Sequence, residues 1–191
     1  MRVRHGIRGA LVAAGALIVL RAQPLEARPE GMAGRTFISP SGEPFRSGGP
    51  VDPFDAWFDR VDANHDGRID RAEFRADAEA FFRVLDTNRD GVLDGFEIAA
   101  YERSIAPELS APTEAHAVST SPDAPVMLLG DPEPVTSADL RLDSKITLAE
   151  WLQVTDERFD LLERKRRGYL DRADLVALLP KESRPREAGG R

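Results

Sequence analysis

Two stretches of twelve residues decide how this chain folds. Residues 62–73 read DANHDGRIDRAE (loop I), and residues 86–97 read DTNRDGVLDGFE (loop II). Both place Asp or Asn at the first, third and fifth positions, glycine at the sixth, an apolar residue at the eighth and glutamate at the twelfth. This spacing predicts a tight turn at the glycine that brings the oxygen-bearing side chains around one point.

The predicted oxygen donors match the chemistry of calcium, a hard cation that takes six to eight oxygen ligands. We expect side-chain ligands at the first, third, fifth and twelfth positions, a backbone carbonyl at the seventh and a water-mediated carboxylate at the ninth. The predicted ligands are Asp62, Asn64, Asp66, Arg68, Asp70 and Glu73 in loop I, and Asp86, Asn88, Asp90, Val92, Asp94 and Glu97 in loop II. Two calcium ions per chain follow, and Glu73 and Glu97 each supply both carboxylate oxygens.

Both loops and their flanks resemble the EF-hand superfamily. Four apolar residues precede each loop at the same offsets, namely Phe54, Trp57, Phe58 and Val61, then Ala78, Phe81, Phe82 and Leu85. The resemblance covers residues 54–103 and extends, more distantly, to small secreted bacterial EF-hand proteins that have two tandem pairs of hands. It implies an all-α fold of helix–loop–helix units with shared central helices, preceded by an extended arm.

A second, degenerate pair of loops follows 77 residues downstream. Residues 139–150 read DLRLDSKITLAE (loop III), and residues 163–174 read ERKRRGYLDRAD (loop IV). Loops III and IV start 24 residues apart, as loops I and II do, which predicts an internal duplication. The alternative is one true pair with an unrelated helical cap.

Loops III and IV carry cations where calcium ligands belong. Arg141 stands at the third position of loop III, while Lys165 and Arg167 stand at the third and fifth positions of loop IV. We therefore expect poor calcium binding there. The basic stretch 164–167 is either a solvated surface or a set of cations that replace calcium by bonding Asp171 and Asp174.

The short spacing also predicts how the halves meet. One helix joins loop I to loop II and another joins loop III to loop IV, so the two loops of a pair lie at opposite ends of their helix. Antiparallel packing of residues 74–85 and 151–162 would pair Ile69 with Leu170 and Leu93 with Ile146. Parallel packing would pair Ile69 with Ile146 instead.

The whole chain divides into six predicted segments. Residues 1–22 have the basic start and short apolar run of a signal peptide, with a cut as late as residue 27. An uncleaved anchor is disfavoured, because twelve apolar residues are too few to span a bilayer. We expect an extended arm at 28–51, an intact pair of hands at 52–103, a proline-rich linker at 104–136, a degenerate pair at 137–180 and a frayed tail at 181–191. Residues 126–130, VMLLG, have the apolar character to dock on a core.

The amino-acid composition excludes several classes of function. The chain has no cysteine and a formal charge of −7, so we expect no disulfide, no lipid anchor on cysteine and no nucleic-acid partner. No catalytic constellation emerges, and we expect a non-enzymatic protein without a membrane span after signal removal, located in the periplasm or secreted. The predicted function is a calcium sensor or buffer. The alternative is a module stapled by calcium that binds a protein partner.

Overall fold

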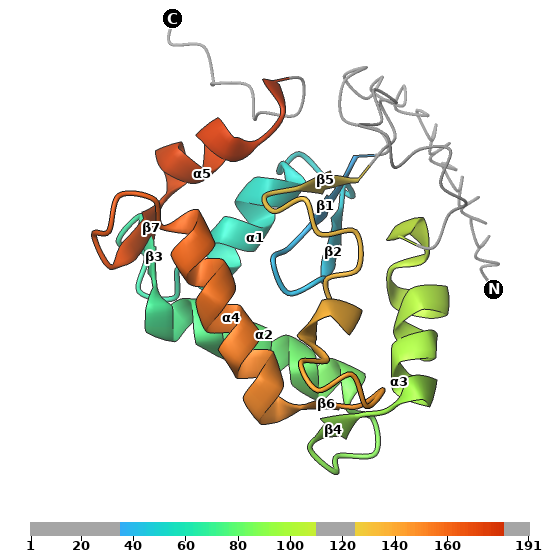
Figure 1. Ribbon diagram of the computed structural model, residues 1–191. Helices are drawn as coiled ribbons and strands as arrows, with labels where there is room; N and C mark the ends of the chain where they lie inside the picture. The colour runs from blue at the N-terminus through green and yellow to red at the C-terminus, as the bar shows by residue number, and fades with distance from the viewer. Residues whose placement is uncertain (1–34, 110–124, 182–191) are drawn as a thin grey trace, which may run out of the picture.

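The computed structural model describes residues 35–109 and 125–181, and in these residues the chain alternates short strands with helices (Figure 1). The elements in chain order are β1 (Thr36–Ile38), β2 (Pro44–Arg46), α1 (Pro53–Val61), β3 (Arg68–Asp70), α2 (Arg71–Leu85), β4 (Val92–Leu93), α3 (Gly95–Ala100), π-helix η1 (Tyr101–Ile105), 3₁₀ helix η2 (Pro107–Leu109), β5 (Val126–Met127), 3₁₀ helix η3 (Thr136–Ala138), β6 (Ile146–Thr147), α4 (Leu148–Leu162), β7 (Tyr169–Asp171) and α5 (Arg172–Leu178). The predicted signal peptide, the middle of the predicted linker and nearly all of the predicted tail lie outside the described residues.

Local sequence explains where the helices begin. At α1, the Asp52 side chain accepts a hydrogen bond from the backbone N–H of Phe54 (2.9 Å), and Pro53 follows at the first helical position. After loops I, II and III, the ninth residue of the loop caps the next helix and the twelfth residue, glutamate, completes a capping box. The same glutamate therefore belongs both to a loop and to a helix.

Helices α2 and α4 pack against each other in antiparallel orientation at the centre of the molecule (Figure 1). The start of α2 lies beside the end of α4, where Arg71 forms ion pairs with Asp156 and Asp160. Further along, the indole N–H of Trp151, near the start of α4, donates to the Ala78 carbonyl (2.8 Å). These contacts place the two loops of each pair at opposite ends of the helix pair.

The loops of one half pair with the loops of the other half. Strands β3 and β7 are antiparallel with Ile69 opposite Leu170, and β4 and β6 are antiparallel with Leu93 opposite Ile146. The predicted antiparallel arrangement is confirmed. All four of these residues are buried, so each bridge also anchors an apolar side chain in the interior.

The expectation of an all-α fold is wrong, because the described residues contain three small sheets besides the helices. Two sheets are the bridges between loops. The third has the order β2-β1-β5, with an antiparallel hairpin at 36–46 and a parallel partner at 126–127. Phe37 and Ile38 are buried, and the backbone of a buried extended segment requires hydrogen-bond partners. Pairing into strands satisfies these groups, and the fold is mixed α and β.

Two apolar clusters fill the interior, one near each end of the helix pair. The first joins α1, β1 and the loop I–loop IV bridge, and it includes Trp57, Phe58 and Phe159. The second joins α3, η1 and the loop II–loop III bridge around Phe82 and Trp151. Each bridge between two loops thus has its own apolar core. Among the described residues, no helix is long and apolar enough to cross a membrane.

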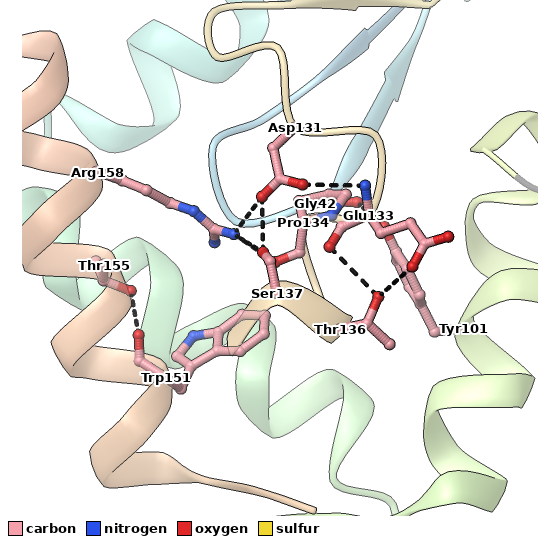
Figure 2. A network of polar contacts seen from close by, with 10 residues as sticks. All are labelled: Gly42, Tyr101, Asp131, Glu133, Pro134, Thr136, Ser137, Trp151, Thr155 and Arg158. Atoms are coloured by element: carbon pink, nitrogen blue, oxygen red, sulfur yellow. Dashed lines mark hydrogen bonds and ion pairs between the residues drawn. The ribbon is translucent and has the colours of Figure 1, made fainter. Parts of the chain in front are cut away.

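A buried arginine ties the segment before loop III to helix α4 (Figure 2). The Arg158 guanidinium donates to the Pro134 carbonyl (2.6 Å), to the Ser137 hydroxyl (2.8 Å) and to the Asp131 carboxylate (3.0 Å). Burial lowers the pKa of Arg158, and the Asp131 carboxylate opposes that shift. Since Asp139 begins loop III just after this segment, Arg158 holds the entry of loop III against the helix that leaves it.

Candidate metal centre

All four loops share one backbone conformation at two positions. The fourth and sixth residues of each loop have positive φ, a region that favours glycine. The fourth residues are His65 (57°), Arg89 (62°), Leu142 (55°) and Arg166 (53°), and the sixth are Gly67 (81°), Gly91 (80°), Ser144 (63°) and Gly168 (82°). The degenerate loops III and IV therefore keep the turn of loops I and II, although loop III has serine where glycine would be unstrained.

The first residue of the loop organises this turn. In loop I, the Asp62 carboxylate accepts from the backbone N–H groups of Asp66 (3.1 Å) and Gly67 (2.9 Å). In loop II, Asp86 accepts from the equivalent groups at 3.1 and 2.9 Å. Both aspartates are buried, so these hydrogen bonds satisfy charged groups that have little access to water.

The third and fifth side chains fold over the same turn. Asn64 accepts from the Asp66 N–H (2.9 Å), and Asp66 in turn accepts from the Arg68 N–H (2.9 Å). Loop II repeats both contacts, at 2.8 and 2.9 Å. Their oxygens thus belong to the same short turn as the first aspartate.

The twelfth residue reaches back across each calcium loop. Glu97 accepts from the Thr87 N–H (2.8 Å) with one carboxylate oxygen and from the Asp94 N–H (3.1 Å) with the other. Glu73 spans loop I in the same way, between the N–H groups of Asn64 (3.3 Å) and Asp70 (3.0 Å). Both oxygens of each glutamate therefore lie within the loop.

The donor set fits calcium chemically, although the acids are not gathered into a tight cluster. Within residues 35–109 and 125–181, no three acidic or histidine side chains converge closely enough to hold an ion. Four carboxylates in one loop repel each other, and each of them takes backbone N–H donors instead. Each carboxylate oxygen has a second lone pair, so these hydrogen bonds hold the loop in shape and leave acceptor sites for a calcium ion.

Loops III and IV present cations to their twelfth residues. In loop III, Arg141 binds the Glu150 carboxylate through Nε (2.9 Å) and Nη2 (3.2 Å). In loop IV, Lys165 donates to Asp174 (2.6 Å), Arg167 also pairs with Asp174, and Arg167 lies 4.0 Å from Asp171. The predicted bonding of the loop IV cations to Asp174 is confirmed, whereas the contact with Asp171 is a long ion pair without a hydrogen bond.

The electrostatics of the two twelfth residues reflect these contacts. The hydroxyl and N–H of Thr147 lower the pKa of Glu150, and Arg141 lowers it further. The hydrogen bond from Lys165 lowers the pKa of Asp174, with an additional contribution from Arg167. Both carboxylates are thus stabilised in their charged form by groups of the protein itself.

The residues predicted as ligands in loops I and II lie around the two turns, and several contacts near them were not predicted. The bond between Arg141 and Glu150 was not predicted, although the pairing of third and twelfth positions contained a signal for it. The hydroxyl of Thr87, which donates to Glu97 (3.0 Å), and the contacts of Arg158 had no recognisable signal. These contacts depend on which residues the fold brings together.

Comparison with known families agrees with this geometry. A family model described as "EF hand" matches the chain twice, over residues 54–76 and 78–100, and the two matches contain loops I and II in full. No curated protein matches the chain. EF hands bind calcium, and their family is typically not enzymatic. Residues 54–100 therefore form two tandem hands of the EF-hand superfamily, and these hands carry loops I and II.

Proposed function

We propose that this chain is an exported calcium-binding protein that holds one ion in loop I and one in loop II and acts as a calcium sensor or buffer. The observation that carries the proposal is the repetition of one complete oxygen set, in one loop conformation, within two adjacent EF hands. Export is inferred from the basic and apolar start of residues 1–22.

Each predicted ligand has a defined role in this proposal. Side-chain oxygens at the first, third and fifth positions and the seventh carbonyl would bind on one side, and the twelfth glutamate would close the shell with two oxygens. The ninth aspartate would act through water. Since no second calcium loop is paired with loop I or with loop II, we expect dissociation constants of about 10⁻⁶ to 10⁻⁴ M.

Calorimetric titration of the chelator-treated protein with calcium tests this assignment. We expect two binding events per chain and preference for calcium over magnesium, because magnesium demands compact six-fold geometry that a bidentate glutamate disfavours. Zero, three or four strong sites would contradict the proposal.

One observation favours the alternative function, a calcium-stapled module that binds a protein partner. Both calcium loops are bridged to loops of the other half, so bound ions would also fasten the two halves together. A hydrophobic dye and far-ultraviolet circular dichroism distinguish the alternatives. A sensor gains dye binding with calcium at nearly constant helix content, a buffer changes neither, and a stapled module gains helix and loses dye binding.

A further inference from the structure

Loops III and IV have the same backbone turn as loops I and II but carry side-chain cations at positions where loops I and II carry oxygen donors. The first residue of loop III makes the same contacts as in the calcium loops, since Asp139 accepts from the N–H groups of Asp143 (3.1 Å) and Ser144 (2.8 Å). The loop III backbone is therefore closed around its first aspartate in the manner of loops I and II.

The guanidinium of Arg141 meets the residue that would close a calcium shell. It forms a two-point contact with Glu150 and lies 3.6 Å from the Asp143 carboxylate, the fifth residue of the loop. Planar guanidinium and carboxylate groups match in this geometry, which makes such contacts strong and directional. Only 9% of the Glu150 side chain is exposed, and its Oε2 also accepts from the N–H (2.9 Å) and the hydroxyl (2.7 Å) of Thr147, so Arg141 completes the set of partners of this carboxylate.

Loop IV also places side-chain cations against its twelfth carboxylate, but with different residues. Lys165 and Arg167 converge on Asp174, which is one methylene shorter than the glutamate of the other loops. Arg167 also stacks on Tyr169, which keeps its guanidinium over the loop. Both degenerate loops thus place positive charge against their twelfth carboxylate, from different residues.

We propose that Arg141 in loop III, and Lys165 with Arg167 in loop IV, are built-in cations that take the place of calcium. Loops III and IV then keep their folded form without metal. Their strands β6 and β7 form a preformed frame, to which β4 of loop II and β3 of loop I are hydrogen-bonded. Arg158 supports this frame, because it holds the entry of loop III to α4 through contacts that involve none of the predicted calcium ligands. Calcium binding at loops I and II would stabilise β3 and β4. Their partner strands, β7 and β6, would need no metal.

The decisive experiment converts loop III into a calcium loop. The double substitution Arg141→Asn with Ser144→Gly removes the internal cation, supplies an oxygen at the third position and removes the strain at the sixth. The resulting loop has oxygen-bearing side chains at positions one, three, five, nine and twelve. Its matched control, Arg141→Met with Ser144→Gly, removes the cation but supplies no ligand.

We expect calorimetry to count three calcium ions in the asparagine variant and two in both the control and the unmodified protein. In chelator, both variants should unfold at a temperature roughly 2–4 °C below the Ser144→Gly protein, and saturating calcium should remove this deficit only in the asparagine variant. The two sites of the control report on the proposed function separately, so a failure there is distinguishable from a failure of this inference.

Two results would overturn the inference. One is an asparagine variant that folds normally and still binds only two ions. The other is a methionine control that unfolds in chelator at the same temperature as the Ser144→Gly protein, since Arg141 would then contribute nothing to holding the loop without metal.

Discussion

The two calcium loops and the two degenerate loops have the same turn but different contents. Asp62, Asp86 and Asp139 each accept from the backbone N–H groups of the fifth and sixth residues, and all four loops have positive φ at the fourth and sixth positions. The third residue separates the pairs, because it is asparagine in loops I and II and a cation in loops III and IV. The backbone turn and the charge at the third position are therefore set by different residues of the same twelve.

The two degenerate loops also differ from each other. Arg141 contacts a glutamate that is well buried, whereas the loop IV cations contact an aspartate whose side chain is 31% exposed. Water and salt weaken exposed ion pairs far more than buried ones. The Arg141 side chain is itself 57% exposed and that of Arg167 31% exposed, so the difference rests on the two carboxylates, and we expect the stabilisation in loop III to exceed that in loop IV only slightly.

The largest expected effect comes from the twelfth residue of a calcium loop. Glu73→Gln and Glu97→Gln each remove one ligand oxygen and one charge, so we expect each to weaken its own site by at least about 100-fold, or about 2.7 kcal/mol. Calorimetry should then count one strong site. Glu150→Gln is the matched control, because it makes the same change in loop III and should leave two sites.

The bridges between the halves give the next largest effect. Ile146→Ala and Leu170→Ala each truncate a fully buried side chain, and we expect each to lower the free energy of unfolding by about 2–5 kcal/mol. Ile146→Ala should also weaken calcium binding in loop II, and Leu170→Ala in loop I, although neither variant changes a ligand. Urea denaturation and calcium titration of both variants measure this. If either substitution weakened calcium binding equally in loops I and II, the effect could not be transmitted through the strand bridges.

A smaller effect should separate loop III from loop IV. Arg141→Met should lower the midpoint of thermal unfolding in chelator by a few degrees, and Lys165→Met by less, because Asp174 keeps Arg167 as a second partner and is more exposed. Added salt should reduce the loop IV effect more than the loop III effect. A larger loss for Lys165→Met would reverse the comparison.

The smallest expected effect is the pH dependence of the contact between Arg141 and Glu150. Hydrogen bonds from Thr147 lower the pKa of Glu150 below its ordinary value of 4.5, and Arg141 lowers this pKa further. The part of the stability that Arg141 contributes is therefore complete above about pH 4.5 and is lost as pH falls through the lower, folded value. The difference in stability between the unmodified protein and Arg141→Met in chelator should therefore shrink at acid pH. A difference that stays constant down to pH 2 would show that the carboxylate charge is not involved.

The positions, residue types and spacing of the four loops can be read from the chain without its fold. Calcium ligation requires particular oxygen-bearing residues at fixed places around a turn, and such a constraint is local, so it can be recognised in twelve residues without knowledge of the fold. The interval of 24 residues forced a single helix between two loops, and the apolar eighth positions identified their bridge partners once antiparallel packing was assumed.

Hydrogen-bond partners that are far apart in the chain depend on the packed fold. Residues 36–46 and 126–127 form a sheet because burial of Phe37 and Ile38 leaves backbone groups that need partners, and the partner segment lies about 90 positions away in the chain. The contacts of Arg158 with Asp131, Pro134 and Ser137 likewise depend on the packing of the preceding segment against α4. Such contacts arise when hydrophobic burial brings polar groups into a place that water does not reach, and the sequence around each of those groups contains no pattern that names its partner.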